Sequence, residues 1–185
     1  SAFSHGINTV YTPLFTPPLD TQRGGERRTV QTVGVKATEE GYEFDFTELE
    51  KFVKFARARG AEYFELSHLA TQWGAQFCPK IMAEEHGEIK RIFGWDTPST
   101  GEAYKSFLAA FLPRLVGRLK EWGIKDRCLL HISDEPSGAH LPTYLKLKEF
   151  IDVYAEGIPV ADALSEYEFY RRKAEDLPAE DIYNT

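Results

Sequence analysis

Two short segments of the chain alternate between hydrophobic and polar positions. In residues 127–136 the apolar positions are Cys128, Leu130 and Ile132, and the alternate positions are Leu129, His131, Ser133 and Glu135. A period of two predicts a β-strand whose successive side chains point to opposite faces. Residues 62–67 repeat the pattern, with Phe64 and Leu66 on one face and Tyr63, Glu65 and Ser67 on the other. We therefore expect two buried strands, each with one apolar face against helices and one face that becomes polar toward its carboxyl end.

Three further segments carry apolar residues at helical spacing. They are residues 49–56, 104–122 and 141–154. Asp45 with Glu48, and Ser99 with Glu102, have the spacing of a capping box, in which the two side chains bond reciprocally to the first turn. The sequence therefore predicts three amphipathic helices, the first two opened by these pairs.

Shorter strands and hairpins are predicted between these elements. The strands are expected at residues 7–11 and 158–162, one hairpin at 29–35 and 42–45, and a second at 80–82 and 89–93. Strands that alternate with helices indicate a parallel sheet. Only four or five barrel strands can be counted, whereas a complete (β/α)8 barrel takes about 250 residues and eight strands. We expect an α/β fold of the TIM-barrel type, incomplete in this chain, with an open α/β sheet as the alternative.

Composition narrows the classes of partner. The chain has 185 residues, of which 42% are hydrophobic, so we expect one domain with a substantial core. The net charge of −7 and the lack of a long basic run argue against nucleic acid or an anionic membrane as the main partner. Cys78 and Cys128 form no metal-binding pattern and are expected to be buried thiols, with a single disulfide as the alternative. No apolar stretch approaches the ~20 residues that span a bilayer, and no leader segment is recognised.

The strongest chemical signal is the adjacent acid pair Asp134 and Glu135. Acids at the carboxyl end of a strand in an α/β fold lie where barrel enzymes place catalytic groups. Two neighbouring carboxylates repel each other, and burial of either one raises its pKa toward the range that a general acid needs. The alternative is a polar strand-to-loop junction, or an Asp134 that caps the following helix.

The spacing of the pair limits the reaction. Retaining glycosidases with two carboxyl groups place them ~5 to 5.5 Å apart across the bond that is cut, and inverting enzymes place them ~6.5 to 9.5 Å apart. Consecutive residues diverge from one backbone and are poorly placed for either arrangement. They suit a substrate-assisted reaction, in which the acetamido oxygen of the sugar is the nucleophile, one carboxylate stabilises that group and the other protonates the leaving oxygen.

The segment His131–Pro136, together with Phe93–Trp95, the helical segment 104–123 and residues 160–164, resembles the catalytic-domain family DUF4091, which is related to glycoside hydrolase family 123. The resemblance covers about residues 5–172 and implies a (β/α)8 barrel with β-N-acetylgalactosaminidase activity. By position, it implies that Asp134 stabilises the acetamido group and that Glu135 is the general acid/base. The barrel of that family continues further, so residues 173–185 are expected to be a charged tail or the start of the remainder.

Five other residues are candidates for sugar binding. They are His68, Trp73, Trp95, His131 and Asp162. The tryptophans could stack on a pyranose ring or could attach their long loop to the core. Asp162 could bind a hydroxyl or cap the next helix. The remaining histidines lack metal-ligand spacing, so we expect no metal site and no other cofactor.

These observations predict a glycoside hydrolase that removes a terminal N-acetylhexosamine, with β-linked N-acetylgalactosamine as the favoured sugar. The alternative is a non-catalytic carbohydrate-binding or structural module derived from the same barrel. A third interpretation is a barrel hydrolase or transferase that acts on another sugar. The partner is expected to be a carbohydrate, with no nucleic acid and no membrane, and the family resemblance favours a secreted or periplasmic location.

Overall fold

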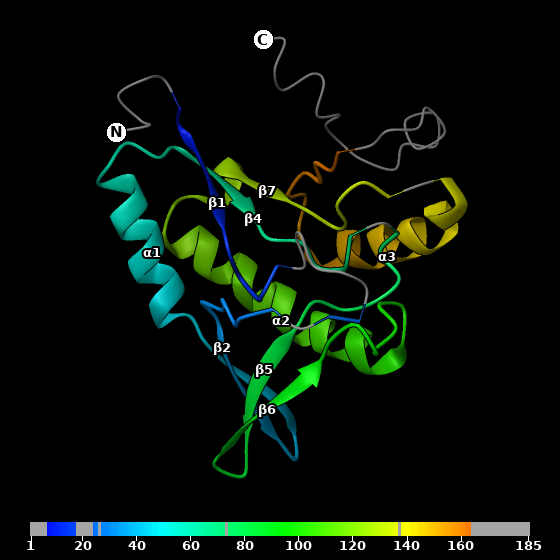
Figure 1. The fold of residues 1–185 in the computed structure, drawn as a ribbon. Helices are drawn as coiled ribbons and strands as arrows, with labels where there is room; N and C mark the ends of the chain where they lie inside the picture. Colours follow the sequence, from blue (N-terminus) through cyan, green and yellow to red (C-terminus); the bar gives the residue numbers. More distant parts are fainter. Residues whose placement is uncertain (1–6, 18–23, 26, 73, 137, 164–185) are drawn as a thin grey trace.

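The computed structural model describes residues 7–17, 24–25, 27–72, 74–136 and 138–163 (Figure 1). The strands are β1 Thr9–Thr12, β2 Gly34–Thr38, β3 Gly41–Asp45, β4 Tyr63–Leu66, β5 Ile81–Glu85, β6 Glu88–Phe93 and β7 Cys128–Leu130. The helices are α1 Thr47–Arg57, α2 Glu102–Glu121 and α3 Leu141–Tyr154, with short 3-10 helices η2 Lys125–Arg127 and η3 Gly138–His140. The expected boundary at residue 172 lies outside the described residues.

Three parallel strands form one sheet, in the order β1-β4-β7. Tyr11 in β1 pairs with Glu65 in β4, which pairs with Leu129 in β7, so these three side chains share one face of the sheet. The strand predicted at residues 158–162 is present only as a parallel bridge between Leu130 and Val160. The carboxyl ends of β4 and β7 therefore meet at one edge, as the two alternating patterns predict.

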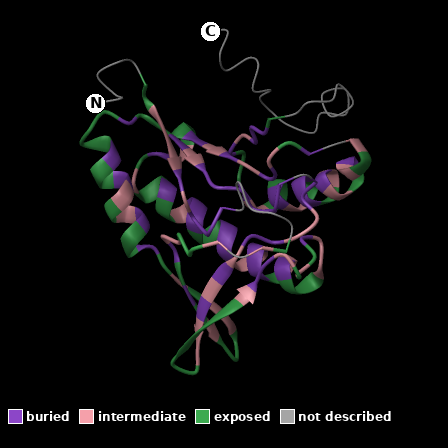
Figure 2. Cartoon of the chain, viewed as in Figure 1, coloured by how far each residue is buried: buried purple, intermediate pink, exposed green. Residues whose placement is uncertain are grey.

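The second sheet has four strands in the order β3-β2-β5-β6. Both of its hairpins were predicted, but the first strand of the first hairpin is Gly34–Thr38 rather than residues 29–35. The second hairpin turns at His86 and Gly87, whose φ angles are positive. The two hairpins are joined by a parallel contact between Lys36 of β2 and Glu84 of β5, which the sequence pattern did not predict. Figure 2 shows that the tips of both hairpins are exposed, whereas the start of β5, beside α2, is largely buried.

Helix α2 packs against the second sheet through an aromatic cluster. The ring of Phe107 lies 5.1 Å from Tyr42, 5.6 Å from Phe44 and 5.2 Å from Phe93, measured between centroids. The hydroxyl of Tyr104 donates to the carbonyl of Leu69, in the loop that follows β4 (2.6 Å). Helix α2 therefore connects the four-stranded sheet to the loop at the end of the parallel sheet.

Neither of the two expected capping boxes forms. The N-cap residues are Phe46 for α1 and Gly101 for α2, and neither has a side-chain capping bond. Asp45 instead accepts a hydrogen bond from the backbone N–H of Thr47 (2.9 Å), and the hydroxyl of Ser99 donates to the carbonyl of Ala75. Ser99 therefore holds the loop 69–78 rather than the start of α2.

The chain has a mixed α/β fold, and neither sheet closes on itself within the described residues, so an incomplete TIM barrel is not shown by these residues. Cys78 and Cys128 are both buried free thiols, as expected, and they do not form the alternative disulfide. No helix in the described part of the chain combines the length and the apolar character that crossing a bilayer requires.

Candidate active site

Strand β7 is shorter than its alternation predicts. It ends at Leu130, and the next two residues pair with the loop that follows β4. The backbone N–H of Leu69 donates to the carbonyl of His131 (3.1 Å), and that of Ala70 donates to the carbonyl of Ile132 (2.8 Å). The chain beyond His131 therefore leaves the sheet and runs along this loop.

The alternation predicts that Ser133 faces the polar side of the sheet, but the structure places it elsewhere. Its side chain is completely buried. The hydroxyl donates to the carbonyl of Thr71 (2.7 Å) and accepts from the backbone N–H of Ala75 (3.1 Å). Ser133 therefore fixes the loop 69–78 against the segment that carries the acid pair.

Asp134 and Glu135 lie just beyond this contact. Asp134 is half-buried and Glu135 is exposed. Glu135 has a φ of 43°, in the left-handed region, where a residue with a Cβ atom is strained by roughly 1 to 2 kcal/mol. The N-cap of α3 is His140, so Asp134 does not cap that helix. The turn therefore places two consecutive carboxyl groups beside the end of the sheet, and the helix-cap interpretation of Asp134 fails for α3.

Asp162 lies behind this segment and is fully buried. Its carboxylate accepts hydrogen bonds from the backbone N–H groups of Ile132 (3.0 and 3.1 Å) and Ser133 (3.3 Å) and from the hydroxyl of Tyr144 (2.6 Å). Its Oδ1 is 3.2 Å from Nδ1 of His131. We expected Asp162 to contact a sugar, but its burial places it behind His131 in this structure, where it fixes the backbone and the imidazole.

His131 lies between two carboxylates. Nε2 is 3.8 Å from Oε2 of Glu65, a distance for an ion pair but not for a hydrogen bond. Burial disfavours the charged imidazole, but the carboxylates of Asp162 and Glu65 outweigh it and raise the pKa of His131 to about 9. The contact with His131 in turn lowers the pKa of Glu65. At neutral pH the structure therefore holds an imidazolium between two carboxylates.

His68 stacks on this imidazolium. The ring centroids of His68 and His131 are 4.8 Å apart, with an angle of 28° between the rings. The hydroxyl of Tyr11 is 3.2 Å from Nδ1 of His68. Burial, aided by the charge of His131, lowers the pKa of His68 to about 4, so this imidazole is neutral. The two rings therefore carry different charges although they are in contact.

His68, His131 and Asp162 place potential metal-ligand atoms within 4.8 Å of one another. The oxygens of Asp162 already accept the bonds of two amides and a tyrosine, and stacked rings do not direct their nitrogen lone pairs to one point. These contacts favour a hydrogen-bonded network over a metal centre. The expected absence of a metal stays a prediction.

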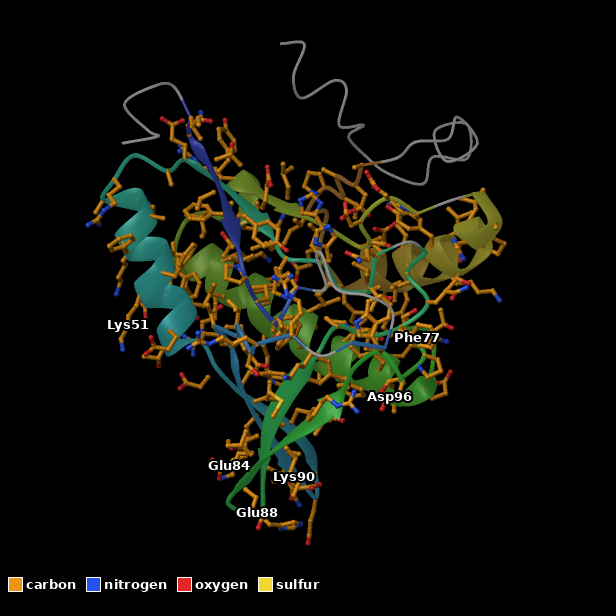
Figure 3. All side chains as sticks on the ribbon, in the orientation of Figure 1. Lys51, Phe77, Glu84, Glu88, Lys90 and Asp96 are labelled. Atoms are coloured by element: carbon orange, nitrogen blue, oxygen red, sulfur yellow. The ribbon has the colours of Figure 1, made fainter. Side chains whose placement is uncertain are left out.

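Trp95 is not brought to this cluster by any described contact. Trp95 follows β6, is half-buried, and lies 6.3 Å from the ring of Phe77. The neighbouring Asp96 forms an ion pair with Arg91 (2.7 Å). Figure 3 shows Phe77 and Asp96 on the side of the molecule where α2 begins, and Glu84, Glu88 and Lys90 along the hairpin β5-β6. Trp95 thus lies against Phe77 of the loop 69–78. Trp73 lies outside the described residues.

The cluster includes three residues that we did not single out from the sequence. They are Tyr11, Glu65 and Tyr144. The alternation did place Glu65 on the polar face of its strand, and parallel neighbours bring Tyr11 to the same face, so the signal for both was present. Tyr144 occupies a core position in the apolar stripe of α3 and gave no such signal.

Comparison with known proteins identifies the family. A family model described as "Glycoside hydrolase 123, catalytic domain" matches residues 1–184, and the chain therefore belongs to this family. Among solved structures, the chain is similar to a family 123 glycoside hydrolase from Clostridium perfringens, determined in a study of glycolipid glycan hydrolysis. The match has 16% identity and a TM-score of 0.65, and it covers 92% of this chain and 30% of that chain. At this identity the likeness concerns the fold alone. No curated protein matches the chain.

Proposed function

We propose that this chain carries the catalytic acid pair of a glycoside hydrolase that removes a terminal N-acetylhexosamine, with β-linked N-acetylgalactosamine as the favoured sugar. The observation that carries the proposal is the turn after β7, which presents Asp134 and Glu135 as consecutive residues beside a buried charged network. Membership of glycoside hydrolase family 123 supports hydrolysis of a glycosidic bond.

The proposed reaction uses the acetamido group of the substrate. The carbonyl oxygen of the acetamido group attacks the anomeric carbon. Asp134 orients this group and stabilises the positive charge that develops on it. Glu135 donates a proton to the leaving oxygen as the glycosidic bond breaks. Glu135 then removes a proton from a water molecule, and the water oxygen attacks the anomeric carbon. This attack opens the oxazoline-type intermediate and gives a sugar of retained configuration.

The buried contacts of the neighbouring residues support this assignment. Ser133 and Asp162 together hold the backbone immediately before the acid pair through bonds to Thr71, Ala75 and Ile132. A rigid support of this kind is what precise placement of reacting groups requires. We further propose that the open parallel sheet is part of a larger (β/α)8 barrel, because its parallel strands β1, β4 and β7 alternate with the helices α1, α2 and α3 along the chain.

The test is the substitution Glu135→Gln in the intact protein, assayed by release of an aryl group from an aryl β-N-acetylgalactosaminide. Loss of a general acid lowers the rate by about 100- to 10,000-fold. The loss should be smaller for a dinitrophenyl leaving group, which departs without a proton. Glu62→Gln, at an exposed position before β4, is the matched control and should keep the wild-type rate. Turnover of Glu135→Gln near the wild-type rate on all substrates would contradict the proposal.

The exposure of Glu135 favours one alternative, a carbohydrate-binding module without catalysis. Titration of the intact protein with N-acetylgalactosamine and with its thiazoline, a mimic of the cyclic intermediate, separates the two. An enzyme should bind the mimic more tightly by orders of magnitude, whereas a binding module should not prefer it.

A further inference from the structure

Glu65 is placed to meet a ligand without belonging to the acid pair. It lies in the middle of the parallel sheet, paired with Tyr11 on one side and Leu129 on the other. Its side chain is 35% exposed, whereas that of its partner His131 is 16% exposed. The carboxylate of Glu65 is therefore the accessible end of the network, and Asp162 is the buried end.

His131 has one ring nitrogen that no described residue satisfies. Nδ1 faces Asp162, but the buried Nε2 makes no hydrogen bond with the described part of the chain and is separated from the carboxylate of Glu65 by 3.8 Å. A buried polar atom without a hydrogen bond is uncommon and calls for an explanation. A hydroxyl oxygen can satisfy it from beside the pair: because Nε2 and Oε2 are 3.8 Å apart, an oxygen that lies off the line between them can be about 2.7 to 2.9 Å from both.

We propose that Glu65 and His131 form a specificity-determining pair that binds one hydroxyl group of the sugar. The inference rests on the proposed function for its class of ligand. Nε2–H of His131 donates to the hydroxyl oxygen, and the hydroxyl proton is donated to the carboxylate of Glu65. Asp162 is a positioning residue in this arrangement, because it fixes the ring that presents Nε2.

The charges of the network suit these roles. His131 is protonated at neutral pH, so both of its nitrogens carry a proton and Nε2 is a donor. Glu65 is ionised and can only accept. Both bonds to the hydroxyl are thus charge-assisted and are stronger than bonds between neutral groups. A sugar that lacks this hydroxyl leaves both charged groups unsatisfied, which is how a polar site discriminates.

The experiment is an NMR titration of the intact protein with methyl β-N-acetylgalactosaminide and its 3-, 4- and 6-deoxy analogues, following the imidazole signals of His131. The proteins compared are the wild type, Glu65→Gln and the control Glu62→Gln. We expect the parent sugar to shift the His131 signals and to bind Glu65→Gln about 10- to 100-fold more weakly than the wild type. The deoxy analogue that lacks the bound hydroxyl should bind the wild type and Glu65→Gln with equal affinity.

Two results would overturn the inference: a sugar that leaves the His131 signals unchanged, or the same weakening by Glu65→Gln for the parent and all three deoxy analogues. The proposed function can fail separately. If the expected pattern of binding is found but the wild type does not hydrolyse an aryl β-N-acetylgalactosaminide, hydrolysis is contradicted and the hydroxyl-binding pair stands.

Discussion

Nδ1 of His131 lies 3.2 Å from Oδ1 of Asp162, although the two residues are 31 positions apart in the chain. The contact joins the end of β7 to the segment that follows α3. The same carboxylate also accepts hydrogen bonds from the backbone amides of Ile132 and Ser133. One buried side chain therefore fixes both the charged imidazole and the backbone that leads to the acid pair. The support of the candidate active site is therefore concentrated at Asp162.

Replacing Asp162 by Asn should destabilise the protein and alter His131. The amide cannot accept all the bonds that the carboxylate accepts, and loss of a buried charged acceptor costs about 2 to 4 kcal/mol in the free energy of unfolding. The pKa of His131 should also fall toward its ordinary value. Denaturant unfolding and NMR titration of the imidazole measure the two effects. Tyr144→Phe, which removes one neutral donor, should cost only about 1 to 2 kcal/mol. If both variants lose the same stability, Asp162 does not have this central role.

Protonation of His131 should make stability depend on pH in a defined window. Its pKa is raised from 6.5 to about 9 by folding, so its contribution is complete below pH 6.5 and is lost as the pH rises to about 9. The contribution is at most about 3 to 4 kcal/mol. The difference in unfolding free energy between the wild type and His131→Gln should therefore shrink across this range. His68, whose pKa is lowered to about 4, titrates below this window. A difference that stays constant from pH 6.5 to 9 would show that His131 is not held in its charged form.

The secondary structure was predictable where local patterns are strong. The apolar stripe of residues 141–154 coincides with α3, and glycines at the turns marked both hairpins. The parallel contact of Lys36 with Glu84 was not predictable, because no local period encodes the pairing of strands that are distant in the sequence. The capping boxes failed for a related reason, since Ser99 found a partner in the loop 69–78 that spacing alone does not reveal.

The candidate site was predictable in part. The acid pair and His131 followed from the polar end of one strand, and His68 followed from its position after another. The burial of Asp162 was not predictable, because it depends on two amides and a tyrosine from other segments. A strand-end acid looks the same in a sequence whether it faces a ligand or lies beneath the site.

Ser133→Ala should affect both stability and activity. It removes two buried hydrogen bonds, one from the amide of Ala75 and one to the carbonyl of Thr71, and leaves these two groups only the 3.2 Å bond between them, which costs about 1 to 3 kcal/mol. Because the loosened residue precedes the acid pair, we expect the kcat of the hydrolysis to fall about tenfold or more. Ser99→Ala removes another bond to the same loop, at the carbonyl of Ala75, and is the control. It should lose similar stability in denaturant but little kcat. Equal losses of kcat would show that Ser133 stabilises the fold without placing the acids.

In the proposed reaction, the acetamido oxygen of the substrate is the nucleophile beside Asp134 and Glu135. The most direct test of this role is the rate at which the intact protein cleaves aryl β-N-acetylgalactosaminides whose acetyl group carries zero, one, two or three fluorine atoms. Fluorine withdraws electrons from the carbonyl oxygen, so kcat/KM should fall steeply with each added fluorine. Rates that stay level across the series would contradict participation of the substrate and with it the proposed roles of both acids.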